Sequence, residues 1–458
     1  MSEPANTAAT NSPRLAKELR APQVVALALG AMIGWSWVLL SASWVASAGA
    51  VGAPLAFGLG GVGILLIALL YAELASAMPK AGGEHVYVAR ALGDKAAFWC
   101  SWALLMAYVT VCVFESVALP TAIAYLAPNI DVVPLWEVAG SSVNLGFVII
   151  GALGAALVTW ANVVGIRTAA RVQTVVTCSI LAAGALLITG AVLAPELAAP
   201  APDFTAGFAG FGAVLIIVPA MLVGFDVIPQ SAEEIDLPPR RLGTLLVASV
   251  AAAVAWYALI SMSVAAGLPQ AQLDASQMGT ADAATALWSS PAAGAALVLA
   301  GIGGIVTSWI AFVLAASRLM YAMALDRMLP SAFARLHPRY RTPANAIIAI
   351  GALSVAAPFA GRALLGWLVD AGSFTVVIAY LFVAAAYLVL RQREPELARP
   401  FRLPAGRLFG TLGLLAALGL FLLFLPFSPS GLSWPHEWLI VLGMALTGLL
   451  AYRQFAAR

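Results

Sequence analysis

Long apolar segments, each bounded by charged residues, proline or glycine, follow one another along the whole chain. They lie at 24–47, 53–78, 97–127, 143–161, 172–194, 208–229, 244–267, 292–325, 343–359, 364–390, 407–427 and 437–452. The segments are apolar on every face of a helix, and most reach the roughly 20 residues that cross a bilayer. The pattern predicts an all-α membrane protein with twelve transmembrane helices, since a membrane β-barrel would show short alternating strands instead.

The composition excludes a soluble globular protein. Of the 458 residues, 62% are hydrophobic and only 10% are charged, and the mean hydropathy is +0.96. Soluble domains carry about 25% charged residues. Twelve spans use most of the chain, so no large domain outside the membrane is expected. The net charge of +2 gives no sign of a nucleic-acid partner.

The basic residues are distributed unevenly among the predicted loops. With the amino terminus inside the cell, the two tails and the loops after even-numbered spans contain all of the 23 lysines and arginines except Arg362. Cytoplasmic loops are enriched in these residues. We therefore expect a multi-pass protein of the inner or plasma membrane with both termini in the cytoplasm.

Two of the predicted helices are interrupted near their middle. The first contains Gly30-Ala-Met-Ile-Gly34-Trp35-Ser36-Trp37, and the sixth contains Pro219-Ala-Met-Leu-Val-Gly224-Phe225-Asp226. Glycine lacks a β-carbon and proline lacks an amide hydrogen, so both free backbone groups that can bind a ligand inside a protein-lined cavity. The alternative is that these residues serve only helix packing. Breaks five spans apart fit an inverted repeat with the substrate between the broken helices.

Four motifs resemble those of the amino acid, polyamine and organocation (APC) transporter superfamily. The most specific is Tyr71-Ala-Glu73-Leu-Ala with Pro79-Lys-Ala-Gly82-Gly83, at the end of span two and in the loop after it. The others are Asn162-Val-Val-Gly165-Ile-Arg167, Ala232-Glu233-Glu234 through Pro238, and Arg318-Leu-Met-Tyr321 with Asp326 and Pro330. The resemblance runs from about residue 22 to residue 345.

This resemblance implies a LeuT-like fold that works by alternating access. The chain would then have a cytoplasmic tail at 1–21, a ten-helix transport core at 22–390 built as a five-plus-five inverted repeat, and two extra helices with the C-terminal tail at 391–458. The substrate would be held by Ile33, Gly34, Trp35, Ser36, Trp37, Ala220, Gly224 and Phe225 of the broken spans, together with Glu115 of span three. Trp35 and Ser36 replace the Ser and Gly of the family motif, whose backbone amides hold the α-carboxylate of an amino acid.

Glu115 lies inside the third span. A carboxylate within the membrane is a functional candidate by default, because leaving it unpaired in lipid is costly. We expect Glu115 to bind a substrate ammonium, with cation–π contacts from Trp35 or Trp37. The alternative is a protonated carboxyl bonded to nearby backbone, with the two tryptophans in packing or interfacial positions.

Three further residues are candidates for ion coupling. Asp226 occupies the position where the superfamily often has an acidic residue for gating or proton coupling; its alternative role is to cap the broken helix. Thr307 and Ser308 are placed like the hydroxyls that hold sodium in LeuT-like transporters, and their alternative role is hydrogen bonding between helices. The fifth span has no lysine, so the residue that replaces sodium in some proton-coupled relatives is missing.

These features predict a permease, that is, a secondary active transporter of amino acids or related small organic amines. Proton symport, sodium symport and exchange are all compatible with the sequence, and no cofactor other than a coupling proton or sodium ion is expected. Its partners would be the small-molecule substrate and membrane lipid. A substrate-sensing receptor or a channel on the same scaffold is the alternative. We do not expect an enzyme, since the three histidines lie in or beside loops and no H-E-x-x-H or G-x-S-x-G motif occurs. Glu73, Glu233 and Glu234 are expected to form salt bridges at the cytoplasmic gate.

Overall fold

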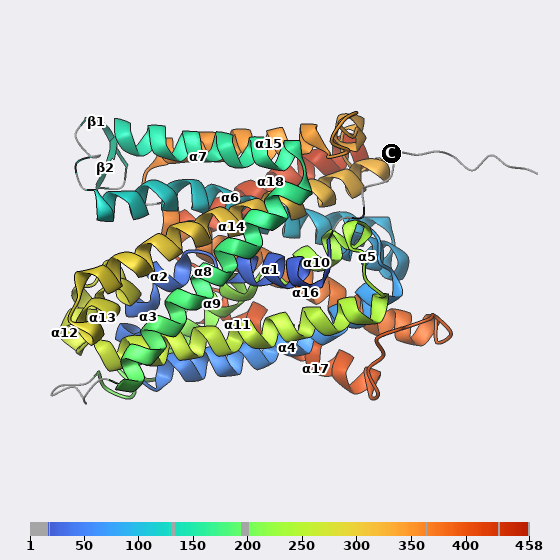
Figure 1. Cartoon of the computed structure of the whole chain (residues 1–458). Coiled ribbons are helices and arrows are strands. Elements are labelled where there is room, and N and C mark those ends of the chain that lie inside the picture. Colours follow the sequence, from blue (N-terminus) through green and yellow to red (C-terminus); the bar gives the residue numbers. More distant parts are fainter. Residues whose placement is uncertain are drawn as a thin grey trace, which may run out of the picture.

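Helices form nearly all of the computed structural model of the chain (Figure 1). The structure describes residues 17, 19–127, 129, 133–138, 140–193, 201–362, 364–428 and 431–456, and for residues 166–171 and 364 it describes the backbone alone. Most of the predicted tail at 1–21 and the last two residues of the segment 391–458 therefore lie outside the described residues.

Within the described residues, ten spans are long and apolar enough to cross a membrane. They are α4 (Gly52–Ala77), α6 (Asp94–Leu126), α7 (Leu145–Val164), α8 (Ile166–Leu193), α9 with α10 (Gly207–Leu222 and Val227–Gln230), α11 (Pro239–Gly267), α14 (Pro291–Leu325), α16 (Leu364–Arg393), α17 (Gly406–Leu423) and α18 (His436–Ala451) with a π-helical turn at Tyr452–Ala456. The first span comprises α1 (Ala21–Met32), α2 (Ser36–Leu39) and α3 (Ser41–Ala48), and the ninth is α15 (Ala344–Ala356) with a 3₁₀ turn at Ala357–Ala360. The predicted twelve spans are confirmed.

Shorter elements connect the spans. They are α5 (Glu84–Leu92), α12 (Gln270–Ala275), α13 (Gly279–Trp288), 3₁₀ turns at Ala232–Glu234 and Ser331–Ala334, and an antiparallel hairpin of β1 (Pro134–Val138) and β2 (Ser141–Asn144). α5 has Glu84 in its first turn and Arg90 in its last, which suits the helix dipole. These elements are too short or too polar to be found from long apolar runs, so the sequence pattern does not predict them.

Contacts between spans repeat with an offset of five. Span two (α4) packs on span seven (α11), span three (α6) on span eight (α14), and span four (α7) on span nine (α15). In the same way α1 packs on α8 in the first half and α9 packs on α16 in the second. An offset of five reverses the direction in which a span crosses the membrane. These contacts are compatible with the predicted five-plus-five inverted repeat.

The loops after even-numbered spans gather at one end of the bundle, which we call the basic end. It carries α5, the segment after α14 and the segment after α16, and the opposite end carries the β-hairpin, α12 and α13 (Figure 1). Between the ends, α14 is central and α18 peripheral, since 78% of the most apolar window of α14 is buried and only 6% of that of α18. The exposed face of α18, with Leu439, Leu446 and Leu450, is apolar and suits contact with lipid.

The two interrupted spans meet in the middle of the bundle, where α1 and α10 are in contact (Figure 1). α1 ends at Met32 and α9 ends at Leu222. Gly224 has a φ of +122°, which favours glycine, and a β-carbon on it would lie 2.7 Å from the β-carbon of Ala31. Glycine therefore allows both the turn and the close approach of the two broken spans.

Candidate functional site

A cavity of about 50 Å³ lies between the two helix breaks. It is lined by Ala31, Met32, Gly34, Ser36, Ala107, Thr110, Val111, Phe114, Glu115, Ala220, Met221, Val223, Phe312, Leu368, Val369 and Gly372. Of the residues predicted at the site, Gly34, Ser36, Glu115 and Ala220 line this central cavity. Most of the lining is apolar, so the few polar groups determine which ligand it suits.

The break in span one leaves backbone groups free beside the central cavity. The amides of Gly34 and Trp35, both described in the structure, form no backbone hydrogen bond. The Tyr257 hydroxyl of α11 donates to the carbonyl oxygen of Met32 at 2.6 Å and lies 3.4 Å from the Ser36 hydroxyl. Tyr257 therefore holds the end of α1 in place, and the two free amides remain as donors for a ligand.

The break in span six is stabilised by Asp226. Its carboxylate accepts the backbone N–H of Gly224 at 2.8 Å and the hydroxyl of Tyr108 at 2.6 Å. The carbonyls of Ala220, Met221 and Leu222, within the described chain, receive no backbone N–H. Asp226 thus replaces the missing helical bonds on one side of the break, and the free carbonyls remain as acceptors.

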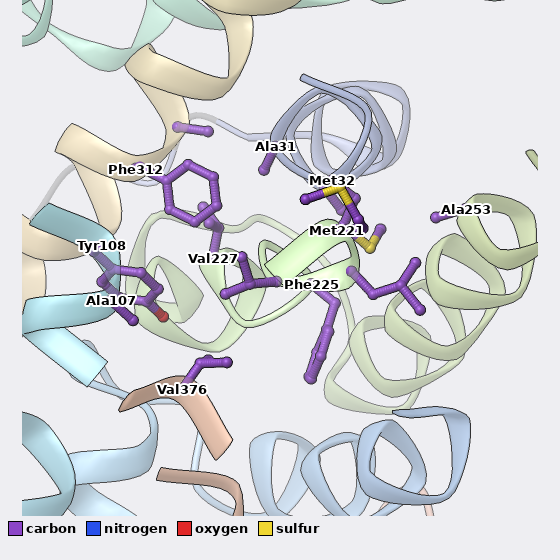
Figure 2. Close-up of a cluster of buried hydrophobic side chains, with 14 of the residues drawn as sticks. Ala31, Met32, Ala107, Tyr108, Met221, Phe225, Val227, Ala253, Phe312 and Val376 are labelled. Carbon is purple, nitrogen blue, oxygen red and sulfur yellow. The ribbon is translucent and has the colours of Figure 1, made fainter. Parts of the chain in front are cut away.

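Apolar side chains surround both breaks. Figure 2 shows Ala31 and Met32 of α1, Met221 of α9 and Phe312 of α14 in one buried cluster. All four also line the central cavity. A ligand in the cavity therefore contacts apolar surface except where it meets the breaks, Glu115 and Thr110.

Glu115 of α6 is the charged residue among the cavity-lining residues, and only 2% of it is exposed. Its Oε1 accepts a hydrogen bond from the Ser308 hydroxyl of α14, and its Oε2 is buried without a hydrogen-bond partner. A β-carbon on Gly34 would lie 3.0 Å from Oε1. The carboxyl therefore lies directly beside the break in span one with one oxygen free.

Trp35 and Trp37 are fully buried but do not line the central cavity. Trp35 packs on Gly301 of α14, where a β-carbon would lie 2.5 Å from its ring. Trp37 packs edge-on against Trp256 of α11, with ring centroids 5.2 Å apart. Successive helical residues point about 100° apart. Ser36 can therefore face the cavity while the two indole rings point away from it and pack against α14 and α11.

The remaining predicted residues of the breaks also lie outside the cavity lining. Ile33 is buried at the end of α1, and Gly224 contacts α1. Phe225 packs between Tyr71 of α4 and Tyr380 of α16, with centroid distances of 5.2 Å and 5.7 Å. These residues shape the site without facing the cavity.

Thr307 and Ser308 of α14 lie beside the break in span one. The Thr307 hydroxyl lies 3.0 Å from the carbonyl oxygen of Gly304 and 3.3 Å from that of Gly30. Ser308 contacts Glu115 and lies 3.0 Å from the Gly304 carbonyl. Both hydroxyls have acceptors within the protein, and Thr307 and Ser308 each reach a group of another helix, Gly30 and Glu115.

Several residues that shape the site were not found from the sequence. Tyr108 and Tyr257 bond to the two breaks, and Thr110, Phe114 and Phe312 line the cavity. A hydroxyl-bearing aromatic residue inside an apolar span is the signal that would have found the two tyrosines. The apolar lining residues resemble ordinary core residues, so their sequence carries no such signal.

The basic end is closed below the central cavity. Arg318 of α14 donates to both carboxylate oxygens of Glu234 at 2.9 Å and 3.1 Å, and both side chains are at most 3% exposed. Leu19 adds backbone bonds of 2.9 Å to Glu234 and Asp236. Glu233, by contrast, lines a surface groove with Lys17 and Lys80.

A second contact at the basic end joins α5 to α14. His85 Nε2 lies 2.8 Å from Asp326, and His85 Nδ1 lies 2.9 Å from the Ser101 hydroxyl. The hydrogen bond from His85 lowers the pKa of Asp326. An ionised Asp326 therefore helps to hold α5 against the end of α14.

A second space lies on the side of the central cavity away from the basic end. A vestibule of about 220 Å³ lies between α3, α9 and the start of α16. It shares Phe114 and Val369 with the central cavity, so the two spaces adjoin. The vestibule and the Arg318–Glu234 pair therefore lie on different sides of the central cavity.

Glu73 joins the ten-helix core to the helices that follow it. Its carboxylate lies 2.5 Å from Arg391 and 3.0 Å from Arg399, and it accepts the backbone N–H of Leu403 at 2.8 Å. Only 1% of the Glu73 side chain is exposed. Glu73 therefore connects α4, α16 and the segment that leads into α17.

Comparisons with known proteins were made for the whole chain. A family model described as amino acid permease matches residues 19–450. A methylthioribose transporter of Bacillus subtilis is 26% identical over 410 residues, which cover 87% of this chain and 86% of that protein. A branched-chain amino acid permease of the same bacterium is 25% identical over 424 residues, with coverages of 89% and 88%. A vacuolar cationic amino acid transporter of Arabidopsis thaliana is 28% identical over 397 residues, which cover 84% of this chain and 64% of that longer protein.

Proposed function

Since the chain belongs to the amino acid permease family, we propose that it is a secondary active transporter of an amino acid or a small organic amine. The observation that supports this substrate class is the free oxygen of Glu115 in the central cavity. A carboxylate held in an apolar cavity favours a cationic ligand group, because a substrate ammonium would neutralise its charge. The carbonyls of Ala220 and Met221 provide further acceptors for the same ammonium.

The position of Glu115 also bears on the rest of the substrate. The free amides of Gly34 and Trp35 could donate hydrogen bonds to a substrate carboxylate. Glu115 Oε1, however, lies beside the backbone of Gly34. Two carboxylates so close together repel each other in a low dielectric. We therefore propose that an amine without an α-carboxylate binds more tightly than the matching amino acid. The relative named a cationic amino acid transporter agrees with a positively charged cargo.

Transport would proceed by alternating access. In the arrangement described, the vestibule leads to the central cavity while the Arg318–Glu234 pair closes the basic end. Transport requires this pair to open as the vestibule closes. We propose that the basic end faces the cytoplasm of a cell whose inner or plasma membrane holds the protein, since all basic residues but Arg362 belong to that end or to the tails.

Thermal stabilisation of the purified protein tests the substrate class. The probes are two matched pairs, L-arginine with agmatine and L-leucine with 3-methylbutylamine. A ligand that binds the folded state raises the apparent melting temperature by mass action. We expect the amine of at least one pair to stabilise more than its amino acid. Equal or stronger stabilisation by both amino acids would contradict the proposed preference.

Glu115→Gln tests the ammonium anchor. Hydrogen bonds to charged groups contribute about 1.5 to 3 kcal/mol, so the affinity for the stabilising amine should fall by about tenfold or more. The matched control is Ser116→Ala, because Ser116 is the next residue, bonds to its own helix at Val113 and lies outside the cavity lining. Unchanged affinity in Glu115→Gln would remove Glu115 from the binding site.

Flux assays in proteoliposomes separate the transporter from the alternatives. We expect saturable uptake of the stabilising amine that continues when choline replaces sodium, because Thr307 and Ser308 have acceptors within the protein. Uptake that requires sodium would restore the sodium interpretation of these two hydroxyls. Binding without flux would indicate a sensor, and conductance that does not saturate would indicate a channel.

A further inference from the structure

Two acidic side chains are buried between the central cavity and the basic end. Asp226 lies at the break in span six, and Glu84 begins α5, in the connection between spans two and three. Both are 0% exposed. They come from segments more than a hundred residues apart, and the fold brings them to the same side of α10.

Gln230 links the two carboxyl groups. Its side-chain amide donates to Glu84 Oε2, and it lies four residues after Asp226, so Asp226 and Gln230 share one face of the short helix. Asp226 is held on its other side by Tyr108 and the backbone of Gly224. The carboxyl groups are close enough for the charge of Asp226 to act on Glu84.

No basic side chain among the described residues forms an ion pair with either carboxyl group. The titratable groups around them are Tyr71 of α4, Tyr87 of α5, Cys100 and Tyr108 of α6, and Tyr380 of α16. α1 has no titratable residue, and Arg318 of α14 is bonded to Glu234. Two full negative charges in this surrounding would lack compensation, which is costly in a buried site.

The hydrogen bonds also require a proton. Glu84 Oε1 and Gln230 Oε1 are both buried without a donor. The Tyr71 hydroxyl approaches Glu84 without the geometry of a hydrogen bond. Buried acceptors in native proteins are almost always satisfied. A proton on Glu84 turns one of these acceptors into a donor and removes the repulsion from Asp226. In agreement, burial and the charge of Asp226 raise the pKa of Glu84 well above its usual range.

We infer that Glu84 and Asp226 form a proton-binding site that holds one exchangeable proton, and that this proton is the coupling ion of transport. This inference rests on the proposed function and deepens it. Asp226 lies on the cavity side and Glu84 on the side of the basic end. A proton that arrives with the substrate would reach Asp226 first, pass to Glu84, and leave when the basic end opens to water.

Infrared spectroscopy of the protein in lipid vesicles tests the site without any substrate. As the pH is raised from neutral to alkaline, we expect the wild type to lose a band of a buried protonated carboxyl group. The reason is that a group with a raised pKa keeps its proton until the pH passes that pKa. Glu84→Gln, which has the shape of the protonated acid, should lack this band, and Asp226→Asn should change its titration.

Two further variants complete the infrared test. The side-chain amide of Gln230 donates to Glu84 Oε2 and so stabilises the ionised form of Glu84. Gln230→Met removes this donor, so the carboxyl band of this variant should persist to more alkaline pH than that of the wild type. Glu396→Gln changes an exposed carboxylate and should leave the band as in the wild type. A titrating band that is the same in Glu84→Gln as in the wild type would overturn the inference.

Proteoliposomes with an internal pH dye test the coupling. On addition of agmatine or 3-methylbutylamine, the wild type should acidify the interior as the amine enters, beyond any change in protein-free vesicles. Glu84→Gln should still exchange the amine but without acidification. Amine entry without proton movement in the wild type would overturn the coupling while the permease assignment stands. If none of the four probes moves, the proposed substrate class fails, and the infrared titration alone decides on the proton site.

Discussion

Gly304 on α14 faces the break in span one so closely that a β-carbon there would lie 2.3 Å from the carbonyl oxygen of Gly34. One turn earlier, Gly301 makes room for the ring of Trp35. These two small residues let the central helix approach the broken span. The free amides and Glu115 are thereby brought to one side of the cavity.

We predict that Gly304→Ala disrupts the break in span one. Backbone cannot yield to a contact of 2.3 Å as a flexible side chain could, so the substitution should lower the stability by about 1 to 3 kcal/mol, the usual cost of overpacking. It should also weaken binding of the stabilising amine. Thermal unfolding with and without the amine measures both effects.

Gly58→Ala is the matched control, because a β-carbon on Gly58 of α4 meets nothing within 4 Å. Alanine favours a helix over glycine by about 0.5 to 1 kcal/mol, so this variant should be no less stable than the wild type. Equal behaviour of the two variants would mean that the close approach at Gly304 has no structural importance.

The residues of the site could be predicted only in part. Gly and Pro at matching places in spans one and six indicate the breaks, and an acidic residue in an apolar span indicates Glu115. The directions of Trp35 and Trp37 depend on how α2 restarts after the break, which no spacing in the sequence specifies. The proximity of Glu84 to Asp226 depends on how α5 packs, and α5 does not stand out in the sequence as an apolar run.

At the scale of elements, buried ion pairs fix how helices meet at the basic end. Glu73 connects α4 to α16 and to the segment before α17, whereas Arg90 of α5 and Glu394 form an exposed pair at 2.6 Å. The two arrangements contain the same chemical groups. They differ in burial, which determines the energetic cost of breaking them.

We predict that Glu73→Gln strongly destabilises the protein. It leaves the guanidinium groups of Arg391 and Arg399 without their counter-charge, and removing one partner of a buried ion pair typically costs about 3 to 5 kcal/mol. Arg90→Ala breaks the exposed pair and should cost less than about 1 kcal/mol. Thermal unfolding of both variants checks the difference, and similar losses would contradict the assigned role of Glu73.

At the scale of the whole molecule, the Arg318–Glu234 pair closes one end of the bundle, and the vestibule lies toward the other. The positions and number of the spans could be predicted from apolar runs, and the inverted repeat from the resemblance and the two breaks. Which end is closed could not be predicted. Closure depends on Arg318 meeting Glu234 and on Leu19 adding backbone bonds, and these contacts join segments far apart in the sequence.

We predict that Arg318→Ala shifts the protein toward opening at the basic end. Glu234 then loses its partner, so the closed form is disfavoured. An Ala107→Cys substitution places a thiol in the central cavity, and Cys178, the exposed native cysteine among the described residues, is replaced by serine. A membrane-impermeant thiol reagent added at the basic end should label the Arg318→Ala variant faster than its parent.

Arg335→Ala serves as the control, because Arg335 is an exposed arginine in the segment that follows α14. It should leave the labelling rate unchanged. If Arg318→Ala also leaves it unchanged, the Arg318–Glu234 pair does not control access to the cavity.

The partners of Glu73 have a consequence for how such chains evolve. Two of its partners, Arg399 and Leu403, come after the tenth span, although Glu73 itself belongs to the second. A descendant that lost the last two helices by truncation before residue 399 would keep the buried carboxylate of Glu73 but lose Arg399, one of its two guanidinium partners. The two terminal helices can therefore be gained or lost only together with a compensating change in α4, so they and the core evolve as one unit.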